Sequence, residues 1–433
     1  MISSLAIFAL SLLALVDARP SSSTAYFDGL RTSLIDNGLS GLWNAIAVAN
    51  STDSGPDLLS KLYYNDKFTI YAPNNAAWQA SELSQPPAND DLVSLLSYHI
   101  VQATLNSSTD IAPIRHHTIA FTELRSPTVD FPGDQTQVIV LETAVNATTG
   151  QDVNDGSVLV RGDNWNATSA GDQFTYENLY IQPIDKILAV PSPLLKTLSQ
   201  SGLAISANLG ATSAISAISS ANLNDTLYQQ CHGCTFFIPV NNAFENATQT
   251  GNYTGLDDGS KRNVILNHVL NGSVVYSPEL TGGSAFVTAA GMPLIFLTDE
   301  QGKKFVSVGQ YRATILRSDI PVSNGVVHNC RIDNDALTSQ LIDTLMVVSQ
   351  NNHQRADDAA SSAASAADSR TTTTNVIGIG GTAAPATSTT STATTSAATG
   401  SQTGSSAFST RRIDIEGVVK VSVISMILGG MWL

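Results

Sequence analysis

The chain has 433 residues, of which 13% are charged, and its formal net charge at pH 7 is −15. No cluster of lysine or arginine offsets this charge, which argues against nucleic acids and anionic lipid surfaces as partners. With only three cysteines, the fold cannot depend on a disulfide framework and needs an apolar core of its own.

The N-terminus has the pattern of a secretory signal. Residues 5–16 are an apolar run, and Val16-Asp17-Ala18 resembles a cleavage site. A membrane anchor is the alternative, but the run is short for a bilayer span. We expect residues 1–18 to be removed and the mature chain to enter the secretory pathway.

Three sequence blocks occur twice in the same order, which indicates two copies of one structural unit. The pairs are residues 69–78 and 235–244, 95–101 and 264–270, and 180–185 and 328–333. In the first pair, a β-rich apolar run is stopped by proline and followed by asparagines that can cap a helix. The second pair holds one histidine on an apolar helical face, and the third is strand-like. Two domains of about 150 residues each fit the usual domain size.

These blocks resemble the fasciclin (FAS1) domain: its first strand motif, its Tyr-His segment and its closing strand. The closing motif is intact at residues 324–328 (NGVVH), where the first copy has residues 176–180 (YENLY). The resemblance implies an α+β fold with two tandem domains, residues 22–190 and 191–345. Each is expected to be a twisted, mainly antiparallel β-wedge with packed helices.

The periodicity of apolar residues predicts individual elements of this fold. We expect helices over residues 92–101 and 264–270. We expect strands over residues 68–72, 138–142 and 293–298.

The Tyr-His segment supplies the candidate interaction residues Tyr98, His99 and His268. In the family this segment is linked to cell-adhesion contacts, and the resemblance extends that hypothesis to these side chains. Their apolar helical surroundings favour another interpretation, in which each histidine is buried and bonded to a backbone or tyrosine partner.

No sequence pattern predicts catalysis. The Gly-x-Ser-x-Gly elbow and the phosphate-binding glycine loop are absent from the sequence. Residues 231–234 (CHGC) lack the second ligand pair that a zinc site needs. We expect His116-His117 to be solvated and Arg161-Gly162-Asp163 to be a loop turn rather than an integrin ligand. The protein is therefore expected to be no enzyme and to need no cofactor or metal.

All three cysteines lie in the second domain. Cys234 begins the repeated strand motif, and Cys330 lies in the closing strand. An oxidising compartment favours a disulfide between Cys330 and either Cys234 or Cys231.

Eight Asn-x-Ser/Thr sequons predict N-glycosylation of an exposed surface. All lie within the two-domain region: Asn50, Asn106, Asn146, Asn166, Asn224, Asn246, Asn252 and Asn271.

The C-terminal part has the composition of a stalk and an anchor signal. Residues 346–405 are dominated by Ser, Thr and Ala, which predicts a disordered, O-glycosylated stalk that buries no core. Residues 406–433 resemble a GPI-attachment signal that is removed on anchoring, with Ser405 or Ser406 as the attachment site. A transmembrane helix is the alternative, but the apolar tail is short for a span.

This layout suggests a non-enzymatic protein of cell adhesion or of contact with the extracellular matrix or cell wall. Its expected location is the extracellular face of the plasma membrane, tethered by a GPI lipid, with transfer to the wall as a further option. Its partners would be other surface, matrix or wall components, including a second copy. The alternatives are a carbohydrate-active enzyme of the wall, which needs a concave acidic site, and a carrier of small ligands or lipids, which needs a closed apolar cavity.

Overall fold

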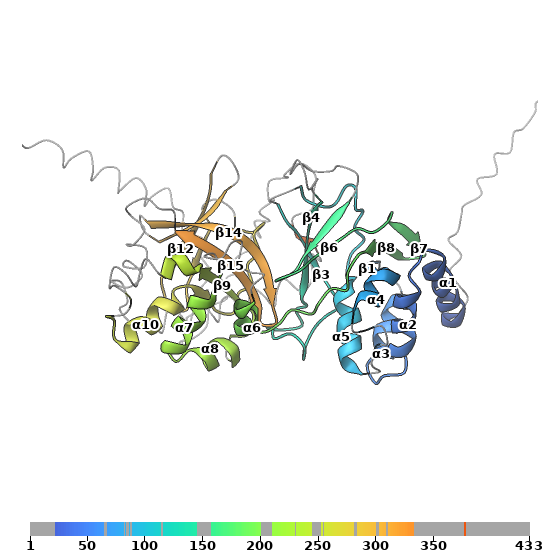
Figure 1. The fold of residues 1–433 in the computed structure, drawn as a ribbon, viewed down its shortest axis with the longest axis horizontal. Helices are drawn as coiled ribbons and strands as arrows, with labels where there is room; N and C mark the ends of the chain where they lie inside the picture. The colour runs from blue at the N-terminus through green and yellow to red at the C-terminus, as the bar shows by residue number, and fades with distance from the viewer. Residues whose placement is uncertain are drawn as a thin grey trace, which may run out of the picture.

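The structure is a computed structural model and describes residues 22–332, apart from short gaps, together with residues 376–377. The gaps are residues 65–66, 82, 84–85, 87–88, 114–115, 145–156, 201–209, 230, 245–252, 254, 281–283, 300–302 and 309–310. Two α+β domains lie side by side, with most helices along one side of the molecule and the sheets along the other (Figure 1).

The described part of the first domain packs helices against two sheets. The helices are α1 (Ser23–Asp36), α2 (Ser40–Ala49), α3 (Gly55–Tyr64), α4 (Asn75–Ala80) and α5 (Asp90–His99). One sheet has the order β2 (Ile100–Val101), β1 (Phe68–Pro73), β8 (Leu179–Ile184), β7 (Phe174–Tyr176). The other has the order β16 (Val376–Ile377), β3 (Thr118–Phe121), β4 (Val138–Thr143), β5 (Val158–Arg161), β6 (Asn166–Thr168).

The second domain has one larger sheet where the first has two. Its described helices are α6 (Leu194–Ser199), α7 (Thr212–Ser220), α8 (Asn224–Gln229) and α10 (Asp258–Leu266). The sheet order is β10 (Val269–Leu270), β9 (Cys234–Pro239), β15 (Gly325–Ile332), β14 (Tyr311–Val322), β13 (Lys304–Val308), β12 (Pro293–Thr298), β11 (Ala285–Val287). Only the pairs β1–β8 and β9–β15 are parallel among the described strands, so the expected mainly antiparallel α+β fold is confirmed.

The repeated sequence blocks form repeated contacts. In the first domain the side-chain amide of Asn178 donates to the Leu62 carbonyl at 2.9 Å. In the second, Asn324 donates to the Leu227 carbonyl at the same distance. Each bond ties the start of the closing strand to a helix of its own domain.

The strand register corrects one part of the sequence comparison. Leu179 pairs with the first residue of β1, and Gly325 pairs with the first residue of β9. Alignment by sequence blocks is therefore wrong by two positions at the closing strand, since Gln182, not Tyr180, corresponds to His328.

Both expected helices end earlier than their apolar pattern suggests. Helix α5 ends at His99 and α10 at Leu266, and the chain then turns at once into the short strands β2 and β10. These strands pair antiparallel with β1 and β9. The apolar pattern runs past the end of each helix because the residues of β2 and β10 are as buried as those of the helices. The pattern alone therefore could not mark where the helix stops.

Residues 376–377 are a second correction, because they lie in the segment expected to bury no core. Val376 is 7% exposed and belongs to a core cluster of the first domain. The expectation of a stalk without structure is wrong at this point. The remainder of residues 346–405 lies outside the described residues, as do residues 1–18 and 406–433 with the candidate anchor sites Ser405 and Ser406.

Candidate functional site

The candidate interaction residues Tyr98 and His99 are core residues. Their exposed fractions are 1% and 2%. His99 Nδ1 lies 2.8 Å from the Leu95 carbonyl, and its Nε2 accepts the amide of Leu188 at 2.9 Å. The imidazole therefore carries its proton on Nδ1 and joins α5 to the chain after β8, which confirms the interpretation of a buried, bonded histidine.

Burial also sets the protonation of these groups. It lowers the pKa of His99 to about 4, against a smaller opposing effect of the bond to Leu95. It lowers the pKa of His268 as well, whose Nδ1 lies 2.7 Å from the Val264 carbonyl. The enclosed imidazole of His99 is a poor contact for an external partner, whereas His268 is partly exposed.

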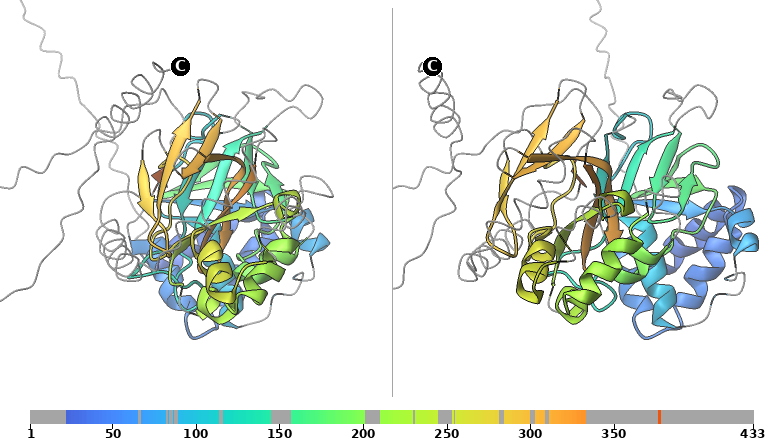
Figure 2. Two further views of the ribbon diagram at one scale, coloured as in Figure 1. Left: turned by 90° about the vertical axis from the view of Figure 1, so that its left-hand side faces the viewer. Right: turned by 60° about the vertical axis from the view of Figure 1, so that its left-hand side comes forward.

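The two domains meet across a shared apolar cluster. Ile119, Val138 and Val140 from β3 and β4 of the first domain pack with Val274, Tyr276 and Val326 of the second. The rings of Phe121 and Tyr276 meet edge to face at 6.4 Å. Each domain thus completes part of its core with side chains of the other, so the pair forms a continuous unit (Figure 2).

A buried chain of charges runs through the same interface. His117 Nδ1 lies 2.5 Å from Asp319 Oδ2, and His117 Nε2 lies 3.6 Å from Glu142 Oε2. Glu142 accepts from Arg161 at 2.7 Å. Both nitrogens of His117 face carboxylates, and both can donate only when the ring is charged. The series Arg161, Glu142, His117, Asp319 therefore links the first domain to the second through side-chain contacts.

A β-bulge aims Asp319 into this interface. The pairing of β14 with β15 shifts register between Arg317 and Ile320, and Asp319 has a φ of 58°. Such a bulge re-aims a side chain at the cost of local strain. The Asp319 carboxylate also accepts the Ser277 amide at 2.6 Å, so both of its oxygens are bonded.

The pKa of Asp319 shows that its partners outweigh its burial. Burial alone opposes ionisation, but the hydrogen bond and charge of His117, the charge of His328 and the bond from Ser277 together hold the pKa well below its usual value. His328 receives the Asp319 amide on Nδ1 at 3.3 Å and has its Nε2 2.9 Å from the Val275 carbonyl. His328, in the closing strand, therefore fixes the backbone of the bulge at Asp319 through a hydrogen bond.

The tripeptide Arg161-Gly162-Asp163 is part of the interface and not a free turn. Arg161 is paired with Glu142, Asp163 is 8% exposed, and the Gly162 carbonyl accepts from Arg317 of the second domain. Burial, with the nearby Arg161 charge, lowers the pKa of Arg317 to about 10. An integrin-type partner needs an exposed tripeptide, so this structure disfavours such binding.

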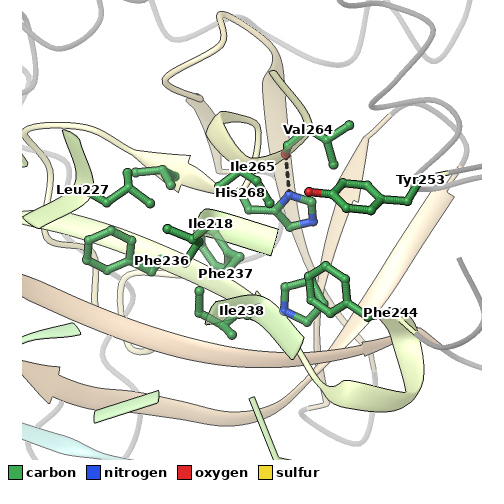
Figure 3. Close-up of a pocket in the computed structure, with 13 residues that line it drawn as sticks. Ile218, Leu227, Phe236, Phe237, Ile238, Phe244, Tyr253, Val264, Ile265 and His268 are labelled. Carbon is green, nitrogen blue, oxygen red and sulfur yellow. Dashed lines mark hydrogen bonds between the residues drawn. The ribbon is translucent and has the colours of Figure 1, made fainter. Parts of the chain in front are cut away.

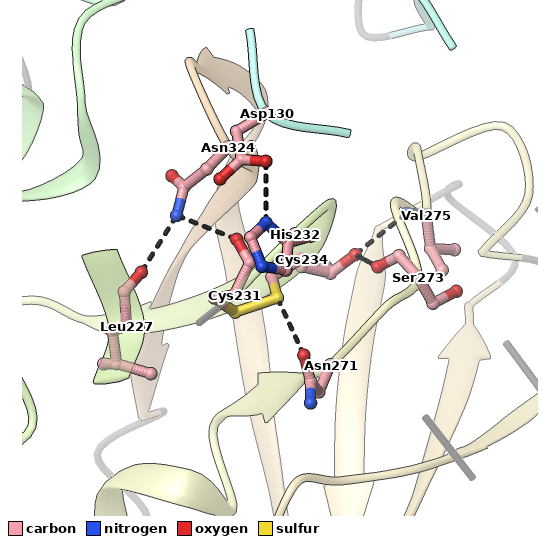
Figure 4. The surroundings of a disulfide bond; sticks show 10 residues. Asp130, Leu227, Cys231, His232, Cys234, Asn271, Ser273, Val275 and Asn324 are labelled. Carbon is pink, nitrogen blue, oxygen red and sulfur yellow. Dashed lines mark hydrogen bonds and ion pairs between the residues drawn. A yellow bond between two sulfur atoms is a disulfide. The ribbon is translucent and has the colours of Figure 1, made fainter. Parts of the chain in front are cut away.

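The disulfide differs from the one expected. Cys231 is bonded to Cys234, and Cys330 is a free, buried thiol (Figure 4). In the parallel register Cys234 faces Gly325, whereas Cys330 faces Pro239 at the other end of the strand. Five residues of strand span about 16 Å, far beyond the reach of a disulfide. The expected Cys234–Cys330 pair is therefore wrong.

The described residues of the second domain enclose an apolar cavity of about 20 Å³, room for about one water molecule. It lies between β9 and helices α7 and α10, and Phe236, Phe244, Val264 and His268 line it (Figure 3). This cavity is too small to hold a lipid.

Five of the eight sequon asparagines are described. Asn50, Asn106, Asn166 and Asn224 are exposed, and Asn271 is partly buried, whereas Asn146, Asn246 and Asn252 lie outside the described residues. The described part of the chain has no group of three His, Cys, Asp or Glu that could hold a metal ion. It also has no helix that is both long and apolar enough to cross a bilayer.

Sequence reasoning missed the interface charges. His116 is exposed as expected, but His117 is buried, and its partner Asp319 is about 200 residues away. The one available signal was that adjacent residues in extended chain point their side chains to opposite faces. If His116 is exposed, His117 then points the other way, towards the interior.

The sequence model of the Fasciclin domain family matches residues 47–191 and 209–333. A relative, the "Fasciclin-like arabinogalactan protein" of Arthroderma benhamiae, is 25% identical over 293 residues, which cover 64% of this chain and 60% of that protein. The chain therefore spans less than two thirds of its relative's length. A solved FAS1 domain pair from the insect cell adhesion molecule Fasciclin I aligns with 70% of this chain and 99% of its own, at 17% identity and a TM-score of 0.32.

Proposed function

The chain belongs to the fasciclin domain family, and we propose that it is a non-enzymatic protein of cell-surface adhesion or of contact with the matrix or cell wall. The observation that carries the proposal is the buried interface between the two domains. It makes them one body, which presents surfaces of both domains in a fixed relation to each other. A partner that bridges both domains then loses no free energy to domain ordering.

The buried charges support a structural role for this interface and not a catalytic one. Glu142 and Asp319 are 2% exposed; Glu142 is paired with Arg161, and Asp319 is bonded to His117 and to the Ser277 amide. A general acid or base needs access to substrate and a pKa near the working pH. Burial among bonded partners removes the access of both carboxylates to substrate, which disfavours the carbohydrate-active alternative at this site.

The exposed sequons support a glycosylated surface location. The name of the fungal relative joins the fasciclin domain to arabinogalactan, which agrees with a glycan-bearing exterior. We place the protein on the extracellular face of the plasma membrane through a GPI lipid. Its partners would be other surface, matrix or wall components, and weak contacts would suffice there because many tethered copies act together.

The test is release of the full-length protein from intact cells by a phosphatidylinositol-specific phospholipase, followed by an aggregation assay. Cells treated with a catalytically inactive phospholipase are the control. Release accompanied by loss of aggregation is the expected result. Release with unchanged aggregation would contradict the adhesion role, and no release would contradict the lipid anchor.

A further inference from the structure

Two aliphatic residues stand out in the C-terminal segment. Between residues 349 and 405 the only Val, Leu, Ile, Met or aromatic side chains are Val376, Ile377 and Ile379. Two of these three form β16, which lies at the edge of the five-stranded sheet. A β-branched pair is suited to a half-buried strand.

Strand β16 pairs with β3, and its two side chains pack on opposite faces of the sheet. Val376 pairs with Ala120 and Ile377 with Ile119 in antiparallel register. Val376 is buried in the core cluster of the first domain, and Ile377 packs against the cluster shared by the two domains. The edge of β3 thus offers backbone groups for pairing. An apolar cluster on each side of the sheet receives one side chain of β16.

We propose that the edge of β3 is a strand-docking site for the segment around Val376-Ile377, and that a second copy of this chain can supply that segment in place of the molecule's own. This inference rests on the proposed adhesion function for its biological meaning and names the partner as another copy. Addition of a strand to an open sheet edge joins chains through main-chain hydrogen bonds, while side-chain pockets give specificity.

Chain length allows the exchange. About 40 residues separate β15 from β16, and fully extended they could reach on the order of 130 Å, far beyond the radius of a domain of this size. A neighbouring copy at high surface density can therefore present the same segment to β3 at a high effective concentration. The contact buries Val376 and part of Ile377, which is a small apolar area, so docking is reversible. Exchange of an identical element is a low-cost route to dimers.

A cysteine cross-link tests the proposal with the full-length chain. One variant carries Ala120→Cys and a second carries Val376→Cys, and the two are mixed under mild oxidation. Directly opposed residues on paired strands have Cβ atoms close enough for a disulfide. Neither variant has both new cysteines, so a 120–376 disulfide, mapped by peptide mass spectrometry, can form only between two molecules.

The matched controls are the double variant A120C/V376C, which should cross-link within one molecule, and Thr389→Cys, twelve positions beyond Ile377 in the sequence, mixed with A120C. The expected result is about tenfold more 120–376 than 120–389 heterodimer, rising with protein concentration. A double variant that closes while the mixture forms no heterodimer would overturn exchange between copies. Failure of the double variant to close would overturn docking itself.

A cell-aggregation assay with the double variant distinguishes strand exchange from the adhesion proposal. Oxidised A120C/V376C, locked within each molecule, should lose aggregation and regain it on reduction, with wild type under the same reductant as control. Absence of aggregation by wild type would count against adhesion only, because the cross-link in solution does not depend on it. Unchanged aggregation by the locked variant would overturn exchange as the adhesive contact.

Discussion

His117 Nδ1 lies 2.5 Å from Asp319 Oδ2, across the boundary between the two domains. Both side chains are buried, with exposed fractions of 9% and 2%. Each domain supplies one member of a buried pair, and either group is expensive to bury without its partner. Stability of the fold and mutual position of the domains are linked through this contact.

Removal of the Asp319 charge should uncouple the domains. Asp319→Asn leaves His117 with one carboxylate and should cost about 3 kcal/mol, the usual range for breaking a buried pair. In chemical denaturation the single transition of the wild type should split into two. The matched control is Asp36→Asn, an exposed carboxylate at the end of α1, which should leave one transition. A single, unshifted transition in Asp319→Asn would contradict the coupling.

Mild acid should destabilise the fold through buried histidines. The pKa of His99 falls from 6.5 to about 4 on folding. Between these two pH values His99 is protonated in the unfolded chain but neutral in the folded chain. The stability that neutral His99 contributes is complete above pH 6.5 and is lost as pH falls towards 4. The free energy of unfolding should drop by about 2 kcal/mol between pH 7 and pH 4.5.

His99→Gln tests the source of this pH dependence. The variant should be less stable at pH 7, because two buried bonds are altered, but should lose less stability on acidification. His116→Gln, at the exposed neighbour of His117, should keep the wild-type profile. An unchanged slope in His99→Gln would assign the effect to His268 and His328, whose pKa values are also lowered by burial.

Gly325 should tolerate no side chain. A Cβ at this position would overlap the Cys234 carbonyl of the neighbouring parallel strand, so Gly325→Ala should destabilise the second domain by more than about 3 kcal/mol. Gly38 is the matched control, because it has a φ of 73° and open space around its Cβ position. Gly38→Ala should cost only about 1 kcal/mol. Thermal unfolding of both variants measures the difference.

The cysteines should show one unreactive thiol. Burial raises the pKa of the Cys330 thiol, so a thiol reagent should label the native protein negligibly and the unfolded, unreduced protein once. Peptide mapping should find Cys231 joined to Cys234. The double variant C231A/C234A should lose only about 2 kcal/mol, because the bond closes a very short loop. A Cys330-containing disulfide would contradict the structure.

The duplicated fold could be predicted because it is encoded locally. Asn74 caps α4 and Asn89 caps α5 through their side chains, and the strand of residues 68–73 is continuously apolar and β-rich. Such signals lie within a few residues of the elements they define. The histidine of the Tyr-His segment could be placed in the core for the same reason, since its neighbours at helical spacing are apolar.

The interface and the disulfide could not be predicted from such signals. Asp319 reaches His117 through a bulge whose register shift has no local sequence pattern. Cys330 looked compatible with Cys234 because the order of elements was known but their relative register was not. The role of Val376 was hidden by its surroundings, since composition averaged over residues 346–405 conceals two residues that pack into a core elsewhere.

Pairing of β16 with β3 also determines how tension travels through the molecule. A pull on the chain beyond Ile377 reaches β3 first and bypasses both the second domain and the residues between β15 and β16. Only when β16 detaches is the load transferred to the end of β15. A tethered copy would then yield in two stages, of which the first is the separation of β16 from β3.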